Sequence, residues 1–288
     1  MLHLYVWLDD PACRELSLTG GKAANLSRLA GLGRVPPGFC LTTAACEQWA
    51  CSDDLSRHYG ALREVLIAAY GELAQRSQAE RPAVAVRSSA VDEDSAGASF
   101  AGQHETYLNI VGVDAIAEAI VRCWASARSP RALEYRRQHG LGMENVRLAV
   151  LVQQLIAADV SAVVFSANPV TGDRDEVVIT ASWGLGESIV GGLVTPDTYL
   201  VRKSNLAVAS RQVADKRRMT VPLPGGTHEV DVPRFLREQP ALEERQLVEA
   251  AHLALDLEQA MGCPVDVECC WWEGKLYLLQ CRPITTLK

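Results

Sequence analysis

The chain has 288 residues, of which 48% are hydrophobic and 22% charged, and its formal net charge is −7. This is the composition of a globular protein and excludes disorder, collagen or coiled coil over the whole chain. The acidic balance makes nucleic acid a poor candidate partner, because an acidic surface repels a phosphate backbone. At about 150 residues per domain, the length suggests roughly two compact units.

Apolar runs predict the strands, and apolar residues at helical spacing predict the helices. In chain order, strands are expected at residues 1–8, 83–86, 106–111, 146–154, 160–167, 176–181, 265–272 and 275–281. Helices are expected at residues 19–30, 42–78, 114–138 and 241–261, the third with an interruption near Ser129-Pro130. The two kinds of element are intermixed without a regular strand–helix–strand repeat, which favours the α+β class over a doubly wound sheet. A boundary near residue 150 would give subdomains of residues 1–150 and 151–288.

The nine cysteines are odd in number and form no CxxC pair, so neither a disulfide framework nor a zinc ribbon fits them. Several lie in apolar runs, where a reduced thiol behaves as a small hydrophobe, and a reducing cytoplasm is the simplest compartment. No apolar stretch approaches the ~18 residues that span a bilayer. The apolar N-terminus lacks a basic start and ends in Asp9-Asp10, unlike a signal peptide. A cytoplasmic protein with no membrane partner is therefore expected.

Gly20-Gly21-Lys22 opens the first predicted helix. Glycines let backbone N–H groups approach a phosphate, the helix N-terminus adds a favourable dipole, and a lysine can reach the charged oxygens. The pattern is not the Walker sequence, so a capped helix with an exposed lysine is the alternative interpretation.

Arg87 follows the apolar strand at residues 83–86, and a loop of small residues from Ser95 to Gly102 comes after it. A guanidinium group makes bidentate hydrogen bonds to phosphate, and the end of a buried strand would hold it rigidly. The loop is small enough to fold over a nucleotide. An ion pair of Arg87 with Glu93 or Asp94 is the structural alternative.

Glu268, Gln280 and Arg282 lie on the two strands of a hairpin that turns at Glu273-Gly274. A two-residue turn brings Glu268 within one position of facing Gln280, and Gln280 shares a sheet face with Arg282 because side chains alternate along a strand. A carboxylate and an amide oxygen at one level suit a hard cation such as Mg²⁺, and an adjacent arginine would hold the phosphates that the ion bridges. Polar residues on a solvated sheet face are the alternative.

The Gly-rich stretch from Trp183 to Glu187 also has two interpretations. It is either a simple turn or a loop whose glutamate accepts the hydroxyls of a ribose. None of the six histidines has metal-ligand spacing to another histidine, a cysteine or a carboxylate.

A series of short motifs occurs along the chain in one order: residues 20–26, 35–39, 86–90 with 93–94, 99–103, 153–154, 165–172, 182–187, 195–197 and 279–285. Together they resemble the N-terminal ATP-binding domain of the family of phosphoenolpyruvate synthase, pyruvate phosphate dikinase and rifampin phosphotransferase. The resemblance covers about residues 17–286, which is almost the whole chain.

The resemblance implies an α+β fold of the ATP-grasp-like kind, with ATP in a cleft between two subdomains. It implies phosphate contacts from Lys22, Arg87, Thr106 and Arg282, with Gly102 in the loop that covers the nucleotide. It also implies adenine contacts from Gln153 and the backbone near Leu155, a ribose contact from Glu187, and Mg²⁺ coordination by Glu268 and Gln280. The residues expected to act in catalysis are Lys22, Arg87 and Arg282. The implied cofactors are ATP and Mg²⁺.

The resemblance also implies a dikinase reaction, in which ATP is split into AMP and phosphate and the β-phosphoryl group passes to a histidine. In the family that histidine lies in a Gly-Gly-x-x-Ser/Thr-His segment, which this chain does not contain. The acceptor is therefore expected on a partner chain or on missing C-terminal domains. A stand-alone kinase that phosphorylates a small molecule directly is the alternative, and a nucleotide-sensing module without turnover is a third.

Overall fold

The structure is a computed structural model that describes residues 4–49, 55–91, 106–138, 148–285 and 287. The chain divides into two compact units: residues 1–28 with 36–155, and residues 29–35 with 156–288. Both units combine helices with antiparallel strands, which confirms the α+β class. The short segment 29–35 belongs to the second unit although both of its neighbours in sequence belong to the first.

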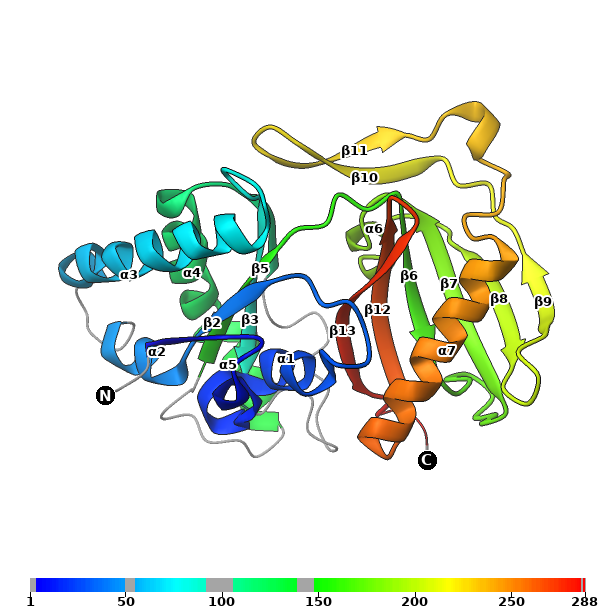
Figure 1. Ribbon diagram of the computed structural model, residues 1–288, viewed down its shortest axis with the longest axis horizontal. Helices are drawn as coiled ribbons and strands as arrows, with labels where there is room; N and C mark the ends of the chain where they lie inside the picture. The colour runs from blue at the N-terminus through cyan, green and yellow to red at the C-terminus, as the bar shows by residue number, and fades with distance from the viewer. Residues whose placement is uncertain (1–3, 50–54, 92–105, 139–147, 286, 288) are drawn as a thin grey trace. The chain divides into compact units, whose positions relative to one another are not determined.

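The first unit holds a five-stranded antiparallel sheet in the order β1-β2-β5-β3-β4 (Figure 1). Its strands are β1 Tyr5–Trp7, β2 Gly38–Leu41, β3 Val84–Ala90, β4 Thr106–Ile110 and β5 Leu148–Gln154. Its helices are the 3-10 turn η1 Pro11–Arg14, then α1 Leu16–Leu29, α2 Thr43–Trp49, α3 Leu55–Arg76, α4 Val113–Ser126 and α5 Pro130–Gln138.

Helices α2, α3 and α4 cover one face of this sheet. In α3, Leu62, Leu66, Ala69 and Leu73 recur every three or four residues and are all buried, as expected for an amphipathic helix. They pack in one cluster with apolar side chains that alternate along the strands: Phe39, Leu41, Val84, Val86, Val150 and Val152. Residues between these on the strands therefore point to the other face of the sheet.

The second unit holds a six-stranded antiparallel sheet in the order β13-β12-β6-β7-β8-β9 and a separate hairpin of β10 and β11. Its strands are β6 Val160–Phe165, β7 Glu176–Trp183, β8 Asp197–Arg202, β9 Val208–Gln212, β10 Arg218–Leu223, β11 Gly226–Asp231, β12 Val265–Trp272 and β13 Lys275–Pro283. Its helices are α6 Glu187–Val190, the 3-10 turn η2 Arg234–Leu236 and α7 Glu244–Met261.

The expected elements are present, with ends that differ by a few residues. Within residues 42–78 the described residues form α2 and α3, and within residues 114–138 α4 and α5 are separated at the expected interruption near Ser129-Pro130. No strand or helix is predicted between residues 188 and 240, where the structure has β8 to β11.

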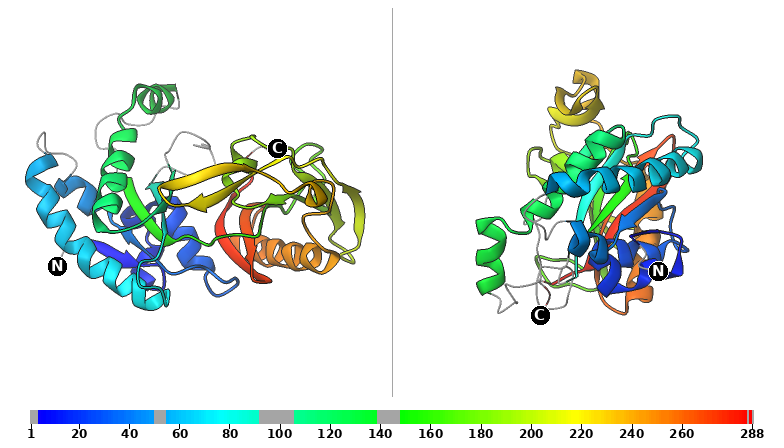
Figure 2. Two further views of the ribbon diagram at one scale, coloured as in Figure 1. Left: turned by 90° about the horizontal axis from the view of Figure 1, so that it is seen from above. Right: turned by 90° about the vertical axis from the view of Figure 1, so that its left-hand side faces the viewer.

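Helix α7 packs along one face of the six-stranded sheet, as Figures 1 and 2 show. Its buried side is made of Leu247, Ala250, Ala251, Leu253, Ala254 and Leu257. A capping box between Glu243 and Gln246 begins the helix, and Gly262 ends it in the left-handed conformation with φ 70°. Trp271 of β12 donates its indole N–H to Glu249 of α7 over 3.2 Å, which identifies the face of β12 that the helix covers.

The described cysteines are free thiols, and all but Cys263 are buried. Burial raises the pKa of the Cys40 and Cys269 thiols well above their ordinary range, so both stay protonated and unreactive. No helix within the described residues has the length and apolar character needed to cross a membrane.

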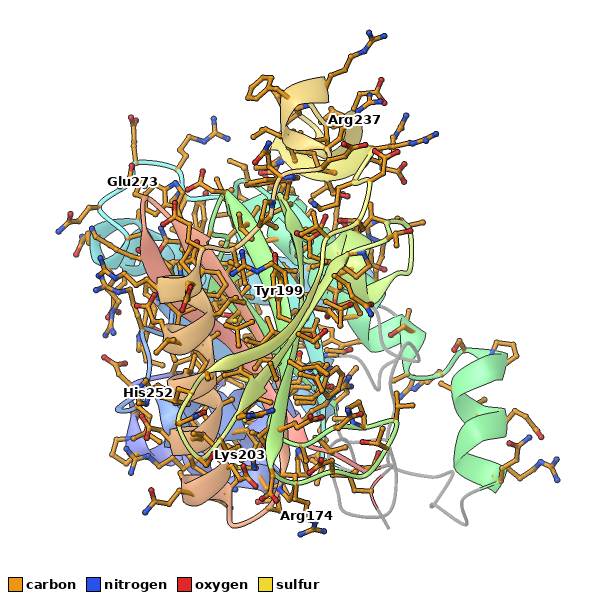
Figure 3. The ribbon with its side chains drawn as sticks, turned by 90° about the vertical axis from the view of Figure 1, so that its right-hand side faces the viewer. Arg174, Tyr199, Lys203, Arg237, His252 and Glu273 are labelled. Carbon is orange, nitrogen blue, oxygen red and sulfur yellow. The ribbon has the colours of Figure 1, made fainter. Side chains whose placement is uncertain are left out.

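Residues 214–241, called here the hairpin segment, leave the sheet after β9 and return at the start of α7. Asp197 ties both ends of this segment to β8. Its Oδ1 accepts hydrogen bonds from Ala214 N (2.8 Å) and Lys216 Nζ (2.6 Å), and its Oδ2 accepts from Ala241 N (2.7 Å) and the Tyr199 hydroxyl (3.0 Å). In Figure 3, Tyr199 lies among the strands of the sheet and Arg237 lies beside the outer 3-10 turn of the segment.

We expect Lys216→Met to destabilise the second unit by about 3–5 kcal/mol. The Asp197 and Lys216 side chains are both fully buried, so removing the ammonium leaves an uncompensated carboxylate inside the protein. The measurement is the urea midpoint of the purified chain, and Arg217→Met, which removes a neighbouring exposed cation, should leave that midpoint unchanged. Equal midpoints for Lys216→Met and wild type would contradict the structural role of the pair.

Candidate functional site

Arg87 lies within a strand rather than at its end, which corrects the sequence-based expectation. Strand β3 continues to Ala90 because it stays paired with β5, with Arg87 opposite Leu151 and Ala90 opposite Leu148. The backbone at Arg87 is held by pairing on both sides, since β4 also flanks β3. The backbone in the middle of a sheet is at least as rigidly held as the backbone at a strand end, so the expected support for Arg87 is kept.

The strand register brings Thr106 and Gln153 to the face that Arg87 occupies. Thr106 lies directly opposite Arg87, and Gln153 lies directly opposite Ala85. Residues directly opposite each other in an antiparallel pair share a face, as do residues two apart on one strand. This face is the reverse of the one that α2, α3 and α4 cover.

Helix α1 approaches this same face through Gly20, where its backbone is not helical (φ 72°, ψ 175°). A Cβ atom at Gly20 would lie only 2.1 Å from the Ser89 carbonyl oxygen of β3. The Ser89 hydroxyl accepts a hydrogen bond from Ala23 N (3.2 Å), and Lys22 Nζ donates to the Ser88 carbonyl oxygen (3.2 Å). Glycine is therefore required for Lys22 to lie against β3, next to Arg87.

Three further residues of the first unit are predicted to bind the nucleotide: Gly102, Gln153 and Leu155. Gly102 lies outside the described residues. The Gln153 side chain is buried, and its Nε2 donates to the Pro36 carbonyl oxygen over 3.1 Å, a contact that also fastens the strand to the chain before β2. The Leu155 N–H donates to the Ala83 carbonyl oxygen over 2.8 Å. Their adenine contacts stay a prediction.

In the second unit, the C-terminal hairpin places Glu268 directly opposite Gln280. Trp272 pairs with Lys275, and a regular ladder from that turn would place Leu279 opposite Glu268. A bulge between Glu268 and Cys269 takes up one residue and shifts the register. Because of this bulge, the carboxylate and the amide lie side by side on the face of β12 opposite to α7.

The bulge also pairs Asp266 with Arg282, and this aspartate is absent from the sequence-based site. Arg282 Nη2 and Nε lie 2.7 and 2.9 Å from Asp266 Oδ2, so the carboxylate orients the guanidinium. Asp266 Oδ1 is buried with no hydrogen-bond partner among the described residues. Asp266 precedes Glu268 by two residues, so the alternation that groups Gln280 with Arg282 could also have identified it.

Burial raises the pKa of Asp266 above its ordinary value of 3.8, and Arg282 opposes the shift without cancelling it. Folding therefore disfavours the charged form of this carboxylate. A buried carboxylate oxygen without a partner is costly, and a bound ion or ligand is one kind of partner that would offset this cost.

Glu187, the expected ribose ligand, is the first residue of the short helix α6 and is exposed. Its Oε2 accepts a hydrogen bond of 3.0 Å from the Thr227 hydroxyl of β11. The sequence does not identify Thr227, because this residue lies in the region where no element is predicted.

Each unit thus has a sheet face that carries charged and polar side chains. The first presents Arg87 and Thr106 beside Lys22, a set suited to phosphate oxygens. The second presents Asp266, Glu268 and Gln280, which are oxygen donors of the kind that hard divalent cations prefer, next to Arg282. No group of three or more His, Cys, Asp or Glu side chains able to hold a metal ion occurs within the described part of the chain.

The amino-acid sequence matches a known protein family over residues 57–288, described as the AMP/ATP-binding domain of pyruvate phosphate dikinase. It is 36% identical to a probable phosphoenolpyruvate synthase of Methanocaldococcus jannaschii, with 100% of this chain and 27% of that protein covered. It is 35% identical to the phosphoenolpyruvate synthase of Pyrococcus furiosus (98% and 44% covered) and 39% identical to a rifampicin phosphotransferase of Streptomyces sviceus (95% and 35% covered).

The chain belongs to the family of pyruvate phosphate dikinase AMP/ATP-binding domains. Relatives from two kinds of phosphotransferase match nearly all of it, which confirms the family suggested by the ordered motifs. The chain spans less than half the length of these relatives.

We expect Gly20→Ala to destabilise the first unit by at least about 2 kcal/mol, because alanine would occupy a backbone region reserved for glycine and overlap the Ser89 carbonyl. Gly71→Ala in α3 is the matched control. A Cβ at Gly71 meets nothing within 4 Å, and the change should stabilise the helix by up to about 1 kcal/mol. Urea unfolding of both variants checks this, and equal midpoints would contradict the close approach of α1 to β3.

We expect the stability difference between wild type and Asp266→Asn to change with pH. Because burial raises the Asp266 pKa, the folded protein binds this proton more tightly than the unfolded chain does. The wild type therefore loses stability as the pH rises through 3.8 and the higher folded-state pKa, and the variant lacks this loss. Urea midpoints of both proteins from about pH 3 to pH 7 test this expectation. It would be contradicted if wild type became more stable relative to the variant as the pH rises.

Proposed function

We propose that this chain is the ATP-binding catalytic part of a dikinase of the phosphoenolpyruvate synthase kind. It would cleave ATP to AMP and phosphate, with water as the acceptor of the γ-phosphoryl group, and pass the β-phosphoryl group to a histidine on another domain or a partner chain. The observation that carries the proposal is the pair of polar sheet faces, one presenting Lys22, Arg87 and Thr106 and the other Glu268, Gln280 and Arg282. Family membership supports the same ligand, since the family is one of AMP/ATP-binding domains.

The proposed arrangement is ATP-grasp-like, with one nucleotide shared by the two units. The first unit would supply phosphate contacts through Lys22, Arg87, Thr106 and the loop at Gly102. Gln153 and the backbone near Leu155 would meet the adenine, and Glu187 of the second unit the ribose. In the first unit the polar strand residues of the site lie on the sheet face opposite to α2, α3 and α4, and in the second unit they lie on the face opposite to α7.

The donor chemistry of the second unit fits Mg²⁺. Asp266 Oδ1 is a buried carboxylate oxygen without a partner in the described structure, and Glu268 and Gln280 place two further oxygen donors on the same face. All are hard oxygen ligands. When bound, Mg²⁺ would neutralise charge on the phosphate oxygens.

The side chains of the chain itself would act by positioning and by charge. Arg87 and Lys22 would hold the phosphates in line with the attacking group, and Arg282, oriented by Asp266, would offset negative charge as the β-phosphoryl group leaves AMP. No side chain on either face has to form a covalent bond. Strand pairing would fix the backbone at Arg87 and Arg282, and the contact of α1 with β3 would fix the backbone at Lys22. These cations would therefore reorganise little as the phosphoryl group is transferred.

Calorimetry with ATP and with AMP tests the assignment of the phosphate contacts. We expect Arg87→Met to weaken ATP binding about 10- to 100-fold, because a charge-assisted hydrogen bond to phosphate is lost. Glu268→Gln should reduce the gain in ATP affinity that Mg²⁺ gives. AMP lacks the β- and γ-phosphates, so both variants should bind AMP like wild type. Equal losses for AMP and ATP would place these residues outside the phosphate site.

Product analysis separates the dikinase from its alternative. With Mg-ATP and the histidine-bearing domain present, AMP and acid-labile phosphoprotein should form together. ADP as the only nucleotide product, with turnover that depends on an added small molecule, would instead establish a stand-alone kinase.

A further inference from the structure

The side chain of Glu187 is not restrained by the residues next to it in sequence. Helix α6 has only four residues, Glu187 is exposed, and its N-cap residue Gly186 has no side chain to hold it. A glutamate in such a position loses rotamer freedom when it binds a ligand, which lowers affinity. The restraint in this structure comes from Thr227, 40 residues away, whose hydroxyl donates to Glu187 Oε2 over 3.0 Å.

Thr227 is itself held in place by three anchors of the hairpin segment. Asp197 binds Ala214 and Ala241 at its two ends. Strand β10 meets the loop before α6, where Leu185 N donates to the Thr220 carbonyl oxygen over 2.8 Å. That approach needs glycine at residue 184, since a Cβ there would lie 2.4 Å from the same oxygen.

We propose that Thr227 is a positioning residue that orients the Glu187 carboxylate for the ribose hydroxyls of the nucleotide, and that the hairpin segment holds Thr227 beside α6. The inference rests on the proposed nucleotide function and goes beyond it, because it makes recognition of the sugar depend on a contact between β11 and α6. With Oε2 engaged by Thr227, the carboxylate presents its other oxygen in one orientation. The nucleotide then meets an acceptor whose rotamer is already selected.

The contact predicts a specific dependence on the sugar. Removing the Thr227 hydroxyl should weaken ligands that carry ribose hydroxyls and spare ligands that lack them. A structural role for Thr227 would affect both kinds of ligand equally, because both need the same folded loop. The ratio of the two affinities therefore separates positioning from folding.

The experiment compares ATP with 2′,3′-dideoxy-ATP by calorimetry on the full chain with Mg²⁺ present. Wild type should bind ATP more tightly than the dideoxy compound. Thr227→Val should weaken ATP about two- to tenfold, the range for one hydrogen bond, and leave dideoxy-ATP unchanged. Thr227→Ser, which keeps the hydroxyl, should restore the wild-type ratio.

Thr220→Val is the matched control within the same hairpin. Its hydroxyl is buried without a hydrogen-bond partner among the described residues, so the same change of hydroxyl to methyl should move neither affinity. Equal weakening of both nucleotides by Thr227→Val, or no change in either, would overturn the positioning role. Equal binding of both nucleotides by wild type would also overturn it. Absence of binding to either nucleotide in wild type would instead refute the proposed function itself.

Discussion

The pairing of β12 with β13 is the constraint on which the polar site of the second unit depends. Side chains alternate along a strand, so a shift of one residue moves every side chain to the other face. The bulge next to Glu268 makes such a shift between the turn at Glu273-Gly274 and the polar residues. Up to the bulge, Leu278 faces the α7 side opposite Cys269, and beyond it Gln280 and Arg282 face the polar side. The even-numbered residues of β13 therefore face α7 between the turn and the bulge, and they face the polar side beyond it.

Two buried aspartates in this unit show opposite solutions to the cost of a buried carboxylate. Asp197 accepts four hydrogen bonds, two at each oxygen, and so satisfies its full acceptor capacity inside the protein. Asp266 engages Arg282 through Oδ2 alone and leaves Oδ1 without a partner in the described structure. The first arrangement stabilises a fold, whereas the second leaves coordination capacity at the polar face. The difference distinguishes a structural carboxylate from one suited to bind a ligand, although both are buried.

The sequence predicts the α+β class, most strands and helices, and the hairpin that carries Glu268 and Gln280, because these follow from local periodicity and turn chemistry. It does not predict β2 or β8 to β11. Strands β9 to β11 are short and largely exposed, so they lack the apolar pattern that marks a strand. Thr227 could not be found for the same reason, since its partner Glu187 is 40 residues away and only the folded hairpin joins them. The predicted strand around Arg87 is too short because pairing with β5, rather than apolar character, carries β3 on through Ser88 and Ser89.

In both units, a glycine with positive φ contacts the backbone of a neighbouring strand close to an expected ligand residue. Gly20 and Gly184 both have positive φ, and a Cβ on either would collide with a carbonyl oxygen of a neighbouring strand, Ser89 in one unit and Thr220 in the other. Each glycine lies two or three residues before a predicted ligand, Lys22 or Glu187. A loop that touches a strand backbone to backbone has little freedom to shift, because the contact involves no flexible side chain. The backbone positions of Lys22 and Glu187 are therefore set by main-chain contact, and larger residues at these glycines would displace the ligand residues even where the chain still folds.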